Sequence, residues 1–218
     1  MSSTYDLLRL MPLLQGVSLD DFHEILEKCP FDFQKASQGD TIQKQNAPCQ
    51  ELIYLVSGTF FSIHQHPGYT IEETIEAPLL IEPYSFMGYN PCYHSSYVAK
   101  EEVSYLVLRK QEILDLLCNY PIIRINLLNI LSRRVQILRE KQFMPIGNDT
   151  REKILYWLQR VCDIPHGEKQ IHIRMEDLGQ NIGHTRVSVS QALALWKEQG
   201  FVSVYRKRLH ITDLRQLR

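Results

Sequence analysis

The sequence has 218 residues, of which 44% are hydrophobic and 22% charged, and its formal net charge at pH 7 is −1. These proportions are ordinary for a globular protein and exclude a disordered or collagen-like chain. No apolar run approaches the roughly 20 residues that cross a bilayer, and residues 1–6 lack the basic and apolar regions of a secretory signal. We therefore expect a cytoplasmic protein without a membrane partner.

The charge is distributed unevenly along the chain. Residues 1–149 contain 12 Lys and Arg against 18 Asp and Glu, whereas residues 150–218 contain 12 against 7. A basic region behind an acidic one indicates that only the C-terminal part meets a polyanion.

The cysteines are scattered and include no C-x-x-C pair: Cys29, Cys49, Cys92, Cys118 and Cys162. Their spacing favours reduced, mostly buried thiols over a disulfide framework, a zinc site or an iron–sulfur cluster. We expect no metal and no other cofactor.

Residues 4–28 have a helical spacing of apolar side chains that is interrupted at Pro12 and Gly16. Ser18, which two aspartates follow closely, is the expected N-cap of a second short helix. Residues 31–108 then change to short β-rich runs separated by turn signals. Many short strands with regular turns predict a closed antiparallel roll. The expected strands are 40–43, 52–56, 59–64, 69–75 and 103–108.

Residues 110–141 return to a helical period. After Pro121, four apolar residues at spacings of 3, 4 and 3 form one stripe, and four others form a second stripe beside it. One stripe can cover the roll while the other needs a partner, so we expect a dimer contact rather than two stripes packed within one monomer. The expected dimer seam is Leu128, Leu131, Val135 and Leu138, and the second stripe is Ile123, Leu127, Ile130 and Ile137.

Residues 142–148 form the interdomain linker, in which Pro145 and Gly147 break the helix. Asn148 or Asp149 then caps a helix that runs to about Val161, and a short strand follows at 170–174.

Residues 175–200 have the pattern of two helices joined by a tight turn. Leu178 and Ile182 form the buried face of a short helix, which Gly183 ends in a left-handed conformation. Thr185 can cap a second helix that buries the residues at 189, 192, 193 and 196. Such a pair is a helix-turn-helix, and strands at 201–205 and 209–211 add a wing.

The second helix leaves several side chains on an outward face near its N-terminus, where recognition helices meet the major groove of double-stranded DNA. Arg can grip guanine and Gln can grip adenine with two hydrogen bonds, whereas hydroxyls and a basic wing tip suit phosphates. An ordinary helix pair with a solvated basic hairpin is the alternative. The expected DNA-binding residues are Thr185, Arg186, Val187, Ser188, Ser190, Gln191, Arg206, Lys207 and Arg208.

These boundaries predict three parts. They are a β-roll sensor with N-terminal helices at 1–109, a dimerisation helix with its linker at 110–147, and a winged helix-turn-helix DNA-binding domain at 148–218.

Four motifs occur in a characteristic order: Pro12–Ser18, Gly39–Ile42, Leu52–Gly58 and the segment from Asp177 to Gly200. With them the chain resembles the cyclic AMP receptor protein / fumarate-nitrate regulator (Crp–Fnr) superfamily over nearly its full length. The resemblance implies an α+β fold, with a cyclic-nucleotide-binding-like antiparallel β-roll, a long dimerisation helix and a C-terminal winged helix-turn-helix. It also implies a homodimeric bacterial transcription regulator without enzymatic activity, which addresses a palindromic DNA site and has RNA polymerase as a protein partner.

The chain departs from the family pattern in two places. In the DNA reader, the Arg-Glu-x-x-x-Arg pattern matches only at Arg186, because Val187 and Gln191 stand at the other two positions; Val187 can contact a thymine methyl group. In the sensor, the cyclic-nucleotide-binding members have a Gly-Glu that engages the ribose and an Arg-Ser that clamps the cyclic phosphate. This chain has Ile81-Glu82 and His94-Ser95 there.

The same part of the chain lacks cations. No Lys or Arg lies between Lys44 and Lys100, so a phosphate in this region would depend on backbone amides, hydroxyls or a protonated histidine. Cyclic AMP is therefore not the expected effector. Six aromatic residues can line a pocket for an uncharged or partly aromatic small molecule, or they can fill the core of the roll: Tyr69, Tyr84, Phe86, Tyr89, Tyr93 and Tyr97. The candidate effector pocket comprises Glu82, Tyr84, His94, Ser95 and Tyr97.

Two other functions are open. Gly58 followed by His64 and His66 resembles the first metal motif of cupins, and the two histidines would share one face of a strand. The roll would then be a metal-binding enzyme domain, although the expected carboxylate comes one residue late, at Glu72. Alternatively, the roll serves a protein partner and the DNA reader is vestigial.

Overall fold

The computed structural model describes residues 4–217, and the chain divides into two units. The short strands separated by turns build most of the first unit. The first unit comprises the chain up to residue 60 together with residues 76–137, and the second comprises 61–75 together with the chain from residue 138 on. Met1–Ser3, which begin the segment without a secretory pattern, lie outside the described residues.

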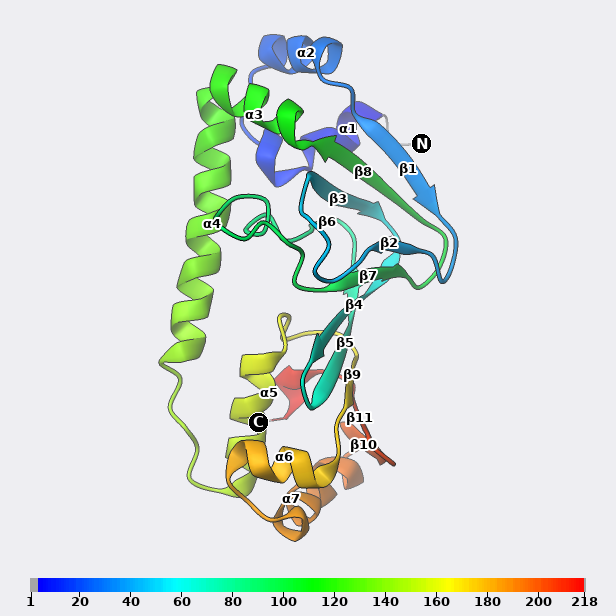
Figure 1. Cartoon of the computed structure of the whole chain (residues 1–218), viewed down its shortest axis with the longest axis vertical. Helices are drawn as coiled ribbons and strands as arrows, with labels where there is room; N and C mark the ends of the chain where they lie inside the picture. The colour runs from blue at the N-terminus through cyan, green and yellow to red at the C-terminus, as the bar shows by residue number, and fades with distance from the viewer. Residues whose placement is uncertain (1–3, 218) are drawn as a thin grey trace. The chain divides into compact units, whose positions relative to one another are not determined.

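The first unit combines N-terminal helices, a set of antiparallel strands and a long helix (Figure 1). Its elements are α1 (Thr4–Arg9), η1 (Pro12–Leu14), α2 (Leu19–Lys28), β1 (Asp32–Ala36), β2 (Thr41–Gln43), β3 (Glu51–Ser57), the start of β4 (Thr59–His66), β6 (Leu79–Leu80), β7 (Ser96–Ala99), β8 (Val103–Arg109), α3 (Lys110–Asn119) and most of α4 (Pro121–Gln142).

The strands of the first unit form a four-stranded antiparallel sheet in the order β1-β8-β3-β6, and β2 pairs with β7. β3 and β8 are the central strands, with Leu52 opposite Leu108. The consecutive residues Leu52–Leu55 of β3 are buried in the core, and Phe60 at the start of β4 is fully buried as well. The expected antiparallel β-roll is confirmed.

Local capping sets the start of the helix after the first loop. The Oγ atom of Ser18 accepts a hydrogen bond of 3.1 Å from the backbone N–H of Asp21, so Ser18 is the N-cap of α2 as predicted. The negative charges of Asp20 and Asp21 in the first turn also stabilise α2, because they lie at the positive end of the helix dipole.

The two stripes on α4 have different surroundings. Ile123 and Leu127 of the second stripe are buried, whereas 62% of Leu128 and 64% of Val135 in the expected dimer seam are exposed. Asn126 fixes this orientation, because its Nδ2 atom donates to the carbonyl oxygens of Leu13 and Gln15 at 3.0 and 2.7 Å. In the expected seam Leu131 is half-buried and the other three residues are exposed, so the single chain covers the second stripe more completely than the seam.

No single helix in the described part of the chain is long and apolar enough to cross a membrane. α3 and α4 combine sufficient length with sufficient apolarity only as a pair, and they are bent by 116° at Tyr120.

The second unit contains helices packed on an antiparallel sheet. Its elements are the end of β4, β5 (Tyr69–Glu76), α5 (Thr150–Val161), β9 (Lys169–His172), α6 (Met175–Ile182), α7 (Arg186–Glu198), β10 (Val202–Tyr205), β11 (Arg208–Ile211) and η2 (Leu214–Gln216). The strand order is β10-β11-β9-β5-β4. β5 pairs antiparallel with β9, with Ile71 opposite Ile171, and both of these residues belong to the core around Trp157 and Trp196.

A buried ion pair joins β5 to the first residue of β9. The Lys169 ammonium, which is fully buried, lies 3.5 Å from the Glu73 carboxylate and donates to the carbonyl oxygens of residues 166 and 167. The same carboxylate accepts from the backbone N–H groups of Asp163 and Ile164 at 2.8 and 3.1 Å. Burial raises the pKa of Glu73, and the N–H groups and Lys169 oppose that shift. Strand β5 is thus held in the second unit by buried polar contacts as well as by apolar packing.

Candidate nucleic-acid interface

The sharp turn between α6 and α7 depends on two glycines. Gly183 ends α6 in the left-handed conformation, with φ 71° and ψ 34°, as predicted. A Cβ atom on Gly179 would lie 2.5 Å from the carbonyl oxygen of His184, so only glycine allows the turn to pack directly on α6. The two helices therefore form the compact pair of a helix-turn-helix.

Thr185 starts the second helix. Its Oγ1 atom accepts a hydrogen bond of 3.2 Å from the backbone N–H of Ser188, which makes it the predicted N-cap of α7. The helix then buries Val189, Leu193 and Trp196 against the rest of the unit. This fixes which side of α7 faces outward.

The outward side carries the expected DNA-reading residues. Arg186, Ser190 and Gln191 are exposed, and 64% of Val187 is exposed as well. Since residues three and four apart lie on the same helix face, these side chains form one surface over the first two turns of α7. That surface combines a guanidinium, an amide, a hydroxyl and an apolar side chain, which can each contact a base edge.

Glu176 is a neighbour of this surface that the sequence pattern did not reveal. Its carboxylate lies 3.2 Å from the guanidinium of Arg186, and both side chains are more than half exposed. The two residues are ten positions apart on different helices, so only the packing of α6 against α7 brings them together. The ion pair gives Arg186 a partner within the protein next to the reading surface.

The wing has a tight basic tip. Tyr205 of β10 pairs with Arg208 of β11, so that only Arg206 and Lys207 form the turn, and both are exposed. Lys207 has φ 60°, a left-handed conformation that residues with side chains adopt mainly at turns. Arg208 is half buried, because its guanidinium lies over the ring of Tyr205 at 4.7 Å. The three cations remain within one short hairpin, which suits phosphate contacts.

His184 connects the turn of the helix-turn-helix to α5. Its Nδ1 atom lies 3.3 Å from the Thr150 hydroxyl, and its Nε2 atom lies 3.1 Å from the Lys153 ammonium. Both contacts tie the turn to the first residues of α5. The sequence pattern alone did not single out this contact.

The expected effector residues come together around one carboxylate in the first unit. Only 4% of Glu82 is exposed, and its carboxylate accepts hydrogen bonds from the backbone N–H groups of His94 and Ser95 and from the Tyr97 hydroxyl. The Tyr84 ring lies beside the His94 ring, at 5.8 Å between centroids.

Two cations from outside the segment also reach this region, which a count along the sequence could not predict. The guanidinium of Arg134 on α4 lies over the ring of Tyr84 at 4.8 Å, and Lys110 on α3 donates to the carbonyl oxygen of Phe86 at 3.1 Å. The absence of Lys and Arg between residues 44 and 100 is therefore not an absence of positive charge around the folded segment. Both cations already contact groups of the protein.

The aromatic residues of the segment do not line one pocket. Phe86, Tyr93 and Tyr97 are buried in the core of the first unit, whereas Tyr89 is fully exposed. Tyr69 lies in the second unit, with its ring against those of His66 and Trp157. Phe86, Tyr93 and Tyr97 therefore fill the core of the first unit instead of lining a pocket.

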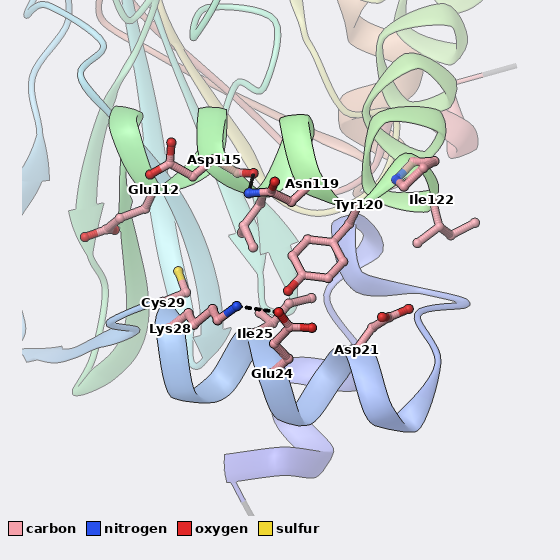
Figure 2. Close-up of a pocket in the computed structure, with 12 residues that line it drawn as sticks. Asp21, Glu24, Ile25, Lys28, Cys29, Glu112, Asp115, Asn119, Tyr120 and Ile122 are labelled. Carbon is pink, nitrogen blue, oxygen red and sulfur yellow. Dashed lines mark hydrogen bonds and ion pairs between the residues drawn. The ribbon is translucent and has the colours of Figure 1, made fainter.

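A cavity of about 600 Å³ lies between α2 and the end of α3, as Figure 2 shows. Its lining includes four carboxylates and one lysine, and that lysine is paired with Glu24. None of the five expected effector residues lines it. An excess of carboxylates opposes the binding of an anion, so this cavity does not offer a site for a cyclic nucleotide. The carboxylates are Asp21, Glu24, Glu112 and Asp115.

The structure gives no support to a cupin-like metal site. Within residues 4–217, no three His, Cys, Asp or Glu side chains gather in a group that could hold a metal ion. His66 instead stacks on Tyr69, and its Nδ1 atom lies 2.8 Å from the carbonyl oxygen of Pro67.

The chain is similar to known proteins in its C-terminal sequence and in its fold. Residues 152–218 match the family of Crp-like helix-turn-helix domains. The fold is similar to that of the catabolite activator protein of Thermus thermophilus, at 22% identity over 94% of this chain and 96% of that one, with a TM-score of 0.51. It is also similar to the sensor domain of the transcriptional regulator DNR from Pseudomonas aeruginosa, at 21% identity over 65% of this chain and 94% of that one, with a TM-score of 0.52. No curated protein matches the chain in sequence. The resemblance to the Crp–Fnr superfamily and the predicted fold class are both confirmed.

Proposed function

We propose that this chain, a DNA-binding transcription regulator of the Crp–Fnr type, binds a palindromic site as a homodimer and responds to an effector through its β-roll. The observation that carries the proposal is the surface of α7. Arg186, Val187 and Gln191 are exposed together at the start of the second helix of a Crp-like helix-turn-helix. That is the part of a recognition helix that reaches base edges in the major groove.

The proposed contacts divide into base reading and phosphate binding. Arg186 reads guanine and Gln191 reads adenine, each with two hydrogen bonds, while Val187 meets a thymine methyl group. Ser190 lies on the same face and contacts a base edge or the adjoining sugar. Phosphates are held by the hydroxyls and N–H groups at the start of α7 and by the wing tip. The phosphate-binding residues are Thr185, Ser188, Arg206, Lys207 and Arg208.

The homodimer is proposed from the exposed stripe on α4. Leu128, Val135 and Leu138 are between 48% and 64% exposed in the single chain, although they follow the spacing of a coiled-coil seam. Packing this stripe against its copy in a second chain buries the apolar surface and places two recognition helices on one DNA duplex. A palindromic site follows from the twofold symmetry of such a dimer.

The effector is proposed to be a molecule other than cyclic AMP. The Arg of the cyclic-phosphate clamp is replaced by His94, and the two cations that reach the segment, Arg134 and Lys110, already contact Tyr84 and Phe86. We further propose that the chain divides into parts at 1–109, 110–147 and 148–218. The protein is proposed to be cytoplasmic, to contact RNA polymerase and to have no catalytic role.

Salt-dependent binding of DNA tests the proposal. Fluorescence anisotropy with labelled genomic fragments is expected to give an affinity whose logarithm falls linearly with the logarithm of the salt concentration, by about 0.9 for each phosphate contact. Arg206→Ala is expected to reduce that slope by about one. Arg160→Ala, an exposed arginine on α5, is the matched control and is expected to leave the slope unchanged. Absence of salt-sensitive binding would support the vestigial reader instead.

A further inference from the structure

Glu82 occupies a conformation that directs its side chain into the roll. It follows the short strand β6 with φ 34°, a region that side-chain-bearing residues rarely adopt. The carbonyl oxygen of Glu82 accepts from the N–H of Ser85 at 2.8 Å, which closes a tight turn. The turn buries the carboxylate, although a buried carboxylate is costly unless it is fully hydrogen-bonded.

Four donors satisfy this carboxylate. The Oε2 atom accepts from the N–H of His94 and the hydroxyl of Ser85, each at 2.7 Å, and Oε1 accepts from the N–H of Ser95 at 2.9 Å and the hydroxyl of Tyr97 at 3.2 Å. The Nδ1 atom of His94 lies 3.3 Å from Oε2 as well. We refer to the two N–H groups and the two hydroxyls as the Glu82 nest.

The nest has the chemistry of an anion site. Successive backbone N–H groups that converge on one point form a concavity for negatively charged oxygens, and hydrogen bonds to a charged acceptor are shorter and stronger than neutral ones. The two N–H bonds, at 2.7 and 2.9 Å, lie within the range of hydrogen bonds to a charged acceptor. A phosphate would need the same donors, so it competes with Glu82 for them.

We propose that Glu82 is the resident anion of the β-roll: its carboxylate fills the nest at His94 and Ser95, and the roll is ordered there without an external anion. An effector of this roll is then uncharged or cationic where it meets the nest. The role of the roll as the sensor rests on the proposed function. The filling of the nest does not, because it follows from contacts within the first unit.

Removal of the carboxylate tests the proposal directly. In Glu82→Gly the nest loses its acceptor, and glycine tolerates the positive φ of this position. Thermal unfolding of the full chain is followed while inorganic phosphate is titrated. The variant is expected to unfold at a lower temperature than the wild type without phosphate, and to regain stability with rising phosphate concentration because phosphate binds the folded state.

The wild type and Asn46→Gly provide the comparison. Asn46 is an exposed residue of the first unit with φ 65°, so Asn46→Gly makes the same kind of backbone change and leaves the nest filled. We expect phosphate to bind Glu82→Gly at least tenfold more tightly than either of these proteins. An equal response of all three proteins overturns the proposal.

The wild type gives a second test that does not require the variant to fold. The amide resonances of His94 and Ser95 are followed by NMR during addition of phosphate and of cyclic AMP. Unchanged resonances support a filled nest, and saturable shifts of these two amides overturn it. DNA binding is measured on the same samples: its absence would contradict the proposed function and leave the result for the nest intact.

Discussion

Arg186 has two alternative partners, an intramolecular carboxylate and a base. The ion pair with Glu176 joins two exposed side chains, and exposed ion pairs contribute about 0–1 kcal/mol. A bidentate contact with guanine discriminates by about 1–3 kcal/mol. Arg186 is therefore expected to leave Glu176 when a cognate site is present and to return to it on other sequences.

Arg186→Ala is expected to weaken binding to the cognate site by about 1–3 kcal/mol and to relax the preference at one base pair of each half-site. The reason is the loss of a side chain that grips a single base with two hydrogen bonds. Titrations against a panel of single-base variants of the site measure this. Lys197→Ala, which removes a charge near the other end of α7, is the control. Equal binding of the variant and the wild type to every sequence in the panel would refute the assigned role.

Glu176→Gln is expected to tighten binding to the cognate site by roughly two- to fivefold, because an exposed ion pair worth about 0–1 kcal/mol no longer has to be broken when Arg186 turns to the base. The ratio of cognate to non-cognate affinity should rise accordingly. Glu198→Gln removes the same charge at the far end of α7 and is expected to change the ratio much less. A larger effect for Glu198→Gln would show that general charge repulsion, rather than the ion pair, is responsible.

Single-residue features were predictable from the sequence where they are local. The caps at Ser18 and Thr185 and the left-handed Gly183 depend on hydrogen bonds and sterics within a few residues. The contacts of Glu176 with Arg186 and of Arg134 with Tyr84 join residues on different elements. No local pattern encodes them, so they required the structure.

At the scale of elements, strands with an apolar run, such as β3, or with alternating burial, such as β5, were found, and others were missed. β3, β4, β5 and β8 correspond to the β-rich runs read from the sequence. β1 (Asp32–Ala36) is mostly exposed and polar, and β6 has two residues, so neither has an apolar alternation to detect. β7 (Ser96–Ala99) alternates buried and half-buried residues but is also short.

The exposed stripe of α4 carries a prediction about assembly. Val135→Glu is expected to raise the dissociation constant of the dimer by roughly a hundredfold or more, because two carboxylates would be buried against each other without partners. Sedimentation equilibrium measures the change. Gln136→Glu introduces the same charge at an exposed position outside the seam and is expected to leave the dimer intact. Dimers that survive Val135→Glu with wild-type affinity would place the interface elsewhere.

The buried pair on β5 and β9 is expected to behave as a coupled unit. Glu73→Gln and Lys169→Met should each lower the free energy of unfolding by about 3–5 kcal/mol, because each leaves an uncompensated buried group. The double variant should be less destabilised than the sum of the two. Chemical unfolding of the four proteins in a double-mutant cycle measures the coupling. Additive effects would show that the ion pair does not couple strand β5 to strand β9.

At the scale of the whole molecule, the resemblance to a superfamily predicted the order of roll, long helix and winged helix-turn-helix, because four motifs occur in sequence along nearly the entire chain. The assignment of residues 61–75 to the second unit was not predictable. From the sequence, the run at 69–75 is one more strand of the roll. In the structure this strand pairs with β9, and Ile71 is buried in the core of the second unit. The proposed division at residues 109 and 147 stays a prediction.

The most direct test of the central claim is a selection of bound sequences from a random DNA pool, with purified wild-type protein in the presence and absence of cyclic AMP. We predict that the same palindromic site is enriched in both arms, since a dimer reads two half-sites and the roll contains its own anion. A site enriched only with cyclic AMP would contradict the proposal for the roll. The absence of any enriched site in both arms would contradict sequence-specific DNA binding itself.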